Sequence, residues 1–75
     1  MATSSPLQPE LVRSLSTKFF YKGERMHFLI TLLYGEHDTV LLKEYDTYDA
    51  YRTNHDILVK ALNNAEAIPD NFARL

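Results

Sequence analysis

The sequence predicts a small α+β domain: a three-stranded antiparallel meander packed on a long C-terminal helix, with a short N-terminal helix before the strands (αβββα order). Two patterns support this fold class. Apolar runs at residues 27–34 and 39–45 flank a polar break at residues 35–38, which is typical of two strands joined by a turn. Residues 47–64 repeat apolar side chains every three or four positions, as an amphipathic helix does.

The 75-residue chain has the length of one small domain. Residues 1–8 are small, polar and interrupted by proline, so we expect a flexible N-terminal arm. The single α+β domain is expected over residues 9–66. An Ala-Ile-Pro sequence at residues 67–69 stops the long helix, and residues 67–75 are expected to form a C-terminal tail.

The first part of the domain is expected to hold a short helix and then a strand. Over residues 8–15, Pro9 suits the first helical position, and leucines spaced by four residues share one helix face. Residues 17–21 contain the run Phe-Phe-Tyr, which favours a strand that turns around Gly23 at residues 22–24. A continuation of the helix through residues 17–21 is the alternative.

The hairpin predicted over residues 27–45 competes with a continuous helix, because leucine is a strong helix former. Gly35 and Asp38 favour the strands, since both residue types are common in turns. We therefore expect cross-strand contacts between residues 29–33 and residues 39–44.

The C-terminal helix is predicted from Thr47 to about Asn64. Asp46 is expected as its N-cap, and Asp49 lies in the first turn, where the helix dipole favours a carboxylate. One face carries an apolar stripe that we expect to pack on the sheet: Tyr48, Tyr51, His55, Leu58, Leu62 and Ala65.

The charge balance and the absence of cysteine limit the expected partners and location. Eight Lys and Arg against ten Asp and Glu give a net charge of −2, whereas proteins that bind nucleic acid normally carry a basic patch. The composition therefore argues against nucleic acid as a partner. Residues 1–6 lack the basic and apolar regions of a secretory signal, so we expect none, and no apolar run approaches the ~20 residues of a membrane span. We expect a cytoplasmic protein without membrane association.

No motif in the sequence indicates a catalytic or metal site. His27, His37 and His55 are ten and eighteen residues apart, which matches no local metal-ligand spacing, and there is no cysteine to complete a zinc site. Ser14 and Ser16 have no nucleophile-elbow sequence around them. The two glycines form no Gly-rich phosphate loop. We therefore expect no enzyme activity, no metal and no cofactor.

The two central strands are apolar on both faces, although a half-exposed antiparallel sheet normally alternates between apolar and polar residues. One long helix covers one face only. The other face, predicted to bear Leu29, Leu33 and Leu41, then needs the N-terminal helix, the C-terminal tail or a second protein to cover it. A second copy of the chain is the preferred cover, which predicts a homodimer. An N-terminal helix folded back over this face is the alternative.

The segment at residues 44–51 combines tyrosines with acidic residues. Tyrosine offers a large, rigid contact area with a polar tip and is enriched in protein interfaces. Tyr45, Tyr48 and Asp49 are therefore predicted to belong to the interface. The alternative is that Tyr48 and Tyr51 face the core and the aspartates only cap the helix.

The predicted function is a small non-catalytic protein–protein interaction module, such as a regulator, inhibitor or accessory subunit, that self-associates through an apolar sheet face. The alternative is a nucleic-acid-linked regulator. Such a protein would bind nucleic acid weakly through Lys18, Lys22 and Arg25, or would imitate it with the acidic Tyr/Asp segment.

Overall fold

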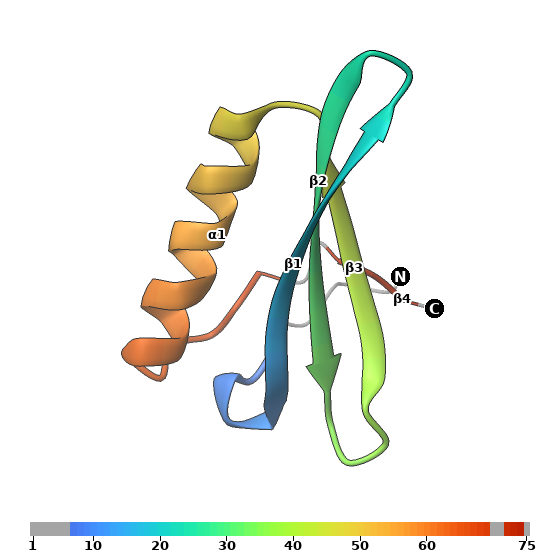
Figure 1. Cartoon of the computed structure of the whole chain (residues 1–75). Helices are drawn as coiled ribbons and strands as arrows, with labels where there is room; N and C mark the ends of the chain where they lie inside the picture. Colours follow the sequence, from blue (N-terminus) through green and yellow to red (C-terminus); the bar gives the residue numbers. More distant parts are fainter. Residues whose placement is uncertain (1–6, 70–71, 75) are drawn as a thin grey trace, which may run out of the picture.

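Four antiparallel strands form one sheet in the computed structural model, and helix α1 packs against one face of it (Figure 1). The structure describes residues 7–69 and 72–74. The strands lie side by side in the order β1-β2-β3-β4. In chain order the elements are η1 (Pro9–Leu11), β1 (Val12–Lys22), β2 (Arg25–Tyr34), β3 (Thr39–Tyr45), α1 (Tyr48–Asn63) and β4 (Ala73–Arg74). The predicted α+β class, the three-stranded meander and the long C-terminal helix are confirmed.

The short N-terminal helix predicted over residues 8–15 is not seen. Residues 9–11 form one turn of 3-10 helix, and β1 begins at Val12. The serines and the threonine that follow disfavour a helix, and pairing with β2 satisfies backbone groups along β1. Residues 17–21 lie within β1, so the strand, and not the continued helix, is the correct alternative for them.

Both hairpin turns use residues with positive φ. Gly23 (φ +65°) lies between β1 and β2, while Gly35 (φ +79°) and Asp38 (φ +50°) begin and end the turn between β2 and β3. Glycine adopts this conformation at little cost, and aspartate tolerates it better than most residues. The Asp38 N–H donates to the Gly35 carbonyl at 3.3 Å. Residues 29–33 pair with residues 40–44, so the predicted hairpin is confirmed.

α1 begins one residue later than predicted. The N-cap is Thr47, whose Oγ1 accepts a hydrogen bond from the Ala50 N–H at 3.2 Å. The prediction of Asp46 as N-cap is wrong, because Thr47 is the last extended residue before the helix. Asp49 occupies the first turn, as predicted.

α1 ends in a Schellman motif. Ala65 has a φ of +53°, and this left-handed residue reverses the chain direction after the helix. The Glu66 N–H donates to the Ala61 carbonyl at 2.8 Å, and the Ala65 N–H donates to the Leu62 carbonyl at 3.4 Å.

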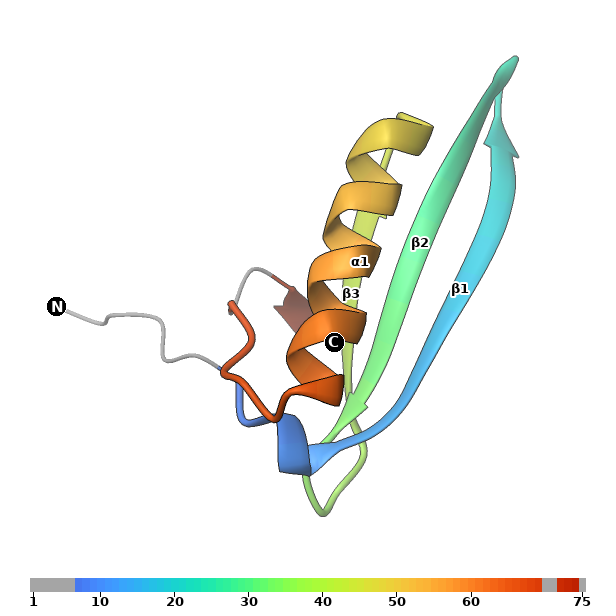
Figure 2. The same ribbon diagram turned by 90° about the vertical axis from the view of Figure 1, so that its left-hand side faces the viewer.

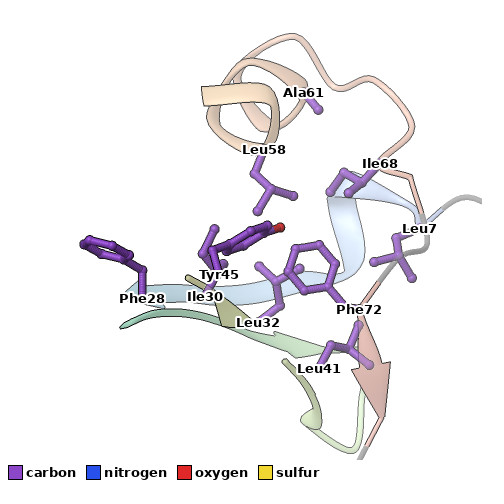
Figure 3. Packing of buried hydrophobic residues seen from close by; sticks show 10 residues of the cluster. All are labelled: Leu7, Phe28, Ile30, Leu32, Leu41, Tyr45, Leu58, Ala61, Ile68 and Phe72. Carbon is purple, nitrogen blue, oxygen red and sulfur yellow. The ribbon is translucent and has the colours of Figure 1, made fainter. Parts of the chain in front are cut away.

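The core lies between α1 and the sheet and includes residues from both ends of the described chain. Ten apolar side chains form it (Figure 3): Leu7, Phe28, Ile30, Leu32, Leu41, Tyr45, Leu58, Ala61, Ile68 and Phe72. Leu7, Ile68 and Phe72 come from outside residues 9–66, the range expected for the domain. Leu7 and Ile68 also exchange two backbone hydrogen bonds, of 2.7 and 2.9 Å. Of the predicted arm, residues 1–6 lie outside the described residues.

Candidate functional site

The strand register divides the sheet into two faces. α1 packs on one of them, which we call the helix-side face (Figure 2). The other, the open face, carries five large apolar side chains, each partly exposed: Phe20, Leu29, Leu33, Val40 and Leu42. Among residues 7–69 and 72–74, no helix lies over the open face (Figure 2). Because a contiguous apolar patch at the surface often marks a binding site, the open face is the first candidate site.

Leu29, Leu33 and Leu41 were predicted to share one face of the sheet, but the structure divides them between the two faces. Leu29 and Leu33 lie on the open face, whereas Leu41 pairs with Leu32 on the helix-side face and is fully buried. The turn between β2 and β3 sets this register. Leu33 pairs with Val40, so the next side chain along β3 points to the opposite face. Leu41 therefore belongs to the core and lies on the wrong side for an interface with Leu29 and Leu33.

Charged side chains border the open face. The register places Lys18, Lys22 and Arg25 on this face, together with His27 and Glu44. Lys22 Nζ lies 3.1 Å from Glu44 Oε2, and His27 Nδ1 lies 2.8 Å from the same oxygen. The hydrogen bond with Lys22, followed by the one with His27, lowers the pKa of Glu44 below its usual value. Glu44 thus neutralises part of the positive charge predicted to attract nucleic acid.

An aromatic cluster joins the first turns of α1 to β1 and β2 on the helix-side face. Phe28 stacks on Tyr51 with the ring centres 5.1 Å apart. Phe19 meets both rings edge-on, at 5.5 and 5.8 Å. Tyr48 and His55 extend the cluster along the helix. The hairpin of β1 and β2 reaches past the start of α1 (Figures 1 and 2), and Phe19 and Tyr48 are each 55 % exposed.

The tyrosine-and-acid segment predicted for the interface is divided between core and surface. Tyr45 pairs with Phe28 on the helix-side face and is buried, so it contributes to the core. Tyr48 and Asp49 lie in the first turn of α1 and are exposed. The predicted alternative of a core-facing Tyr51 fits its half-buried position in the aromatic cluster.

Two exposed aromatic residues of β1 were missing from the predicted site. Phe19 and Tyr21 lie on the helix-side face, in the part of β1 nearest the turn at Gly23, and Tyr21 is 69 % exposed. Strand length is the signal that could have identified them. The strands of the first hairpin are longer than β3, and only two residues separate the end of β3 from the start of α1, so the hairpin extends beyond the helix.

The three histidines lie in different places. His27 contacts Glu44 on the open face, His55 packs 5.5 Å from the Tyr51 ring, and His37 is exposed in the turn after β2. Within residues 7–69 and 72–74, no three His, Cys, Asp or Glu side chains are grouped to hold a metal ion.

Comparisons with known protein families, with curated proteins and with solved structures find no match to this chain. In the part of the chain that the structure describes, no helix has the length and apolar character needed to cross a membrane.

Proposed function

We propose that this chain is a small non-catalytic protein-interaction module of the cytoplasm, and that it forms a homodimer through the open face. The supporting observation is the row of partly exposed apolar side chains on β2 and β3, opposite the face that α1 covers. Each Å² of apolar surface removed from water contributes about 25 cal/mol, so this face gains from a partner. In a two-fold dimer the same patch is buried on both subunits.

The expected dimer is of modest affinity. The five apolar side chains of the patch are already partly buried in the monomer, and association costs the rotational and translational freedom of one subunit. A dissociation constant of roughly micromolar order is typical for such an interface.

Sedimentation velocity over a concentration series tests the dimer. Leu33 lies on the open face of β2, an inner strand of the sheet, so Leu33→Asp places a charge inside the interface. We expect this variant to remain monomeric while its helix content, measured by circular dichroism, is unchanged. Ile57→Asp is the matched control, because Ile57 is 47 % exposed on α1, and it should dimerise like the wild type.

Two outcomes would contradict the proposal. One is a wild-type protein that stays monomeric at millimolar concentration. The other is a dimer that survives both Leu33→Asp and Leu29→Asp, because its interface would then lie elsewhere.

A nucleic-acid-linked regulator is the second candidate function. Lys18, Lys22 and Arg25 share the open face with the Phe20 ring, and cations around an aromatic ring favour a single-stranded nucleic acid. The pairing of Lys22 with Glu44 weakens this candidate. Affinity for an oligonucleotide would fall steeply with salt, whereas dimerisation through the leucines would change little.

A further inference from the structure

The outer edge of β1 has no neighbouring strand in the described part of the chain. β1 is the first strand of the sheet and runs over eleven residues, whereas the opposite edge, that of β3, is partly covered by β4. An edge strand presents unpaired backbone N–H and C=O groups, with which another extended chain pairs readily.

The side chains of β1 form two rows with different chemistry. The row on the open face is mainly polar and basic: Ser14, Ser16, Lys18, Phe20 and Lys22. The row on the helix-side face is mainly apolar: Leu15, Thr17, Phe19 and Tyr21. Phe19 and Tyr21 are 55 % and 69 % exposed, so α1 leaves the end of this second row uncovered.

β1 is also one-sided in charge, because it contains three basic residues and no acidic one. Arg13 and Lys22 are paired with Asp38 and Glu44, at 3.9 and 3.1 Å. Lys18, in the middle of the strand, forms no ion pair with any residue in 7–69 or 72–74.

We propose that this edge binds an extended acidic segment of a partner protein, which joins the sheet as a further strand beside β1. Backbone hydrogen bonds along β1 supply the pairing. Acidic side chains of the segment lie beside Lys18 on the open face, and its alternate apolar side chains cover Phe19 and Tyr21.

The positive charge of β1 disfavours pairing of this edge with β1 of a second copy of the chain. If two β1 strands paired antiparallel about Thr17, Lys18 would face Ser16 of the second copy. The two Lys18 side chains would then be diagonal neighbours, about 7–8 Å apart. No acidic side chain of either β1 would compensate them. Lysine on an edge strand is a common means by which proteins prevent such self-pairing.

Binding of a synthetic peptide to the full chain tests the proposal by amide-resolved NMR. The probe is an end-blocked peptide of about nine residues that alternates valine and glutamate. We expect shifts at residues 12–22 and at Tyr51, and slower hydrogen exchange of β1 amides. A peptide with lysine in place of glutamate should bind at least about fivefold more weakly. A glutamate peptide with N-methylated backbone on alternate residues should not bind.

Charge reversal on the protein gives the matched test. Lys18→Glu should reverse the preference between the two peptides, whereas Lys60→Glu, on the exposed side of α1, should not change it. The proposal is overturned if the glutamate peptide causes no shifts at millimolar concentration, or if its shifts lie on α1. It is also overturned if a single-stranded oligothymidine shifts the same β1 amides equally strongly.

The edge site and the proposed dimer are tested by different variants. Leu33→Asp removes the dimer and should leave peptide binding to β1 unchanged, since Leu33 contributes no group to the outer edge of β1. If dimerisation is lost, peptide binding at the edge of β1 can therefore still be measured, and the reverse also holds.

Discussion

Tyr45 combines a buried ring with a buried hydroxyl. The ring packs in the core beside Leu58 and Phe72 (Figure 3), and the side chain is 8 % exposed. Its hydroxyl has no hydrogen-bond partner among the described residues. Burial raises the pKa of Tyr45 above its usual value of 10.0, because the ionised form is excluded from the core.

Tyr45→Phe is expected to leave stability at neutral pH unchanged or to raise it by about 1 kcal/mol, because it removes an unsatisfied buried hydroxyl and keeps the ring. The raised pKa also predicts an alkaline effect. Above pH 10 the tyrosine ionises more readily in the unfolded chain than in the folded one, so the wild type loses stability as pH rises. The Tyr45→Phe variant should lose less stability than the wild type over the same pH range.

Urea denaturation at neutral pH and above pH 10 measures both effects. Tyr21→Phe is the control, because Tyr21 is 69 % exposed and should change neither value. A large loss of stability in Tyr45→Phe at neutral pH would mean that the hydroxyl has a hydrogen-bond partner.

At the scale of elements, the chain leaves α1 through Ala65, a residue in an unfavourable backbone conformation. A left-handed conformation costs an L-residue about 1–2 kcal/mol, and Ala65 has neither glycine's freedom nor asparagine's polar side chain. The two hydrogen bonds of the Schellman motif hold it there.

Ala65→Gly is therefore expected to stabilise the domain by about 0.5–1 kcal/mol, measured by thermal or urea unfolding. Ala67→Gly is the control, because residue 67 lacks a positive φ and should gain nothing. A destabilised Ala65→Gly would show that the helix does not end in this way in solution.

The elements that could be predicted from sequence are those with a strong local pattern. The hairpin around residues 35–38 depends on turn residues and is confirmed. The helix stripe depends on periodicity and is confirmed at its centre, where Leu58 is buried and Leu62 packs against the core. At its two ends the stripe is wrong, because Tyr48 and Ala65 are exposed. The prediction of a helix over residues 8–15 is wrong because leucines at four-residue spacing are also compatible with other structure. Leu7 lies in a β-bridge, Leu11 in the 3-10 turn and Leu15 in β1. Pairing with β2 decided between helix and strand.

At the scale of the molecule, the candidate site could be predicted only in part. Leu29 and Leu33 were correctly placed on one face, because alternation within a strand is local. Leu41 and Tyr45 lie on the helix-side face, opposite Leu29 and Leu33. This placement depends on the register between β2 and β3, which the periodicity within each strand does not determine. The exposed edge of β1 depends on the strand order in the sheet.

The core also depends on the segment after α1. Ile68 is fully buried and Phe72 nearly so, although both lie in the predicted tail. Ile68→Ala is expected to cost about 2–5 kcal/mol, which is a large part of the stability of a small domain. Ile57→Ala, at a 47 % exposed position, should cost about 0.5 kcal/mol or less.

Urea midpoints of the two variants test this difference. Equal midpoints for Ile68→Ala and Ile57→Ala would mean that the segment after α1 does not pack on the sheet in solution.

The bridge between Leu7 and Ile68 has a consequence for synthesis of the protein. A nascent chain that has been translated only through α1 has its first three strands but lacks Ile68 and Phe72, and Leu7 has no backbone partner at that stage. Its core stays open to solvent on the side that these residues close. Stable folding must therefore wait until residue 72 has left the ribosome, and until then the incomplete core is a surface that a chaperone could bind.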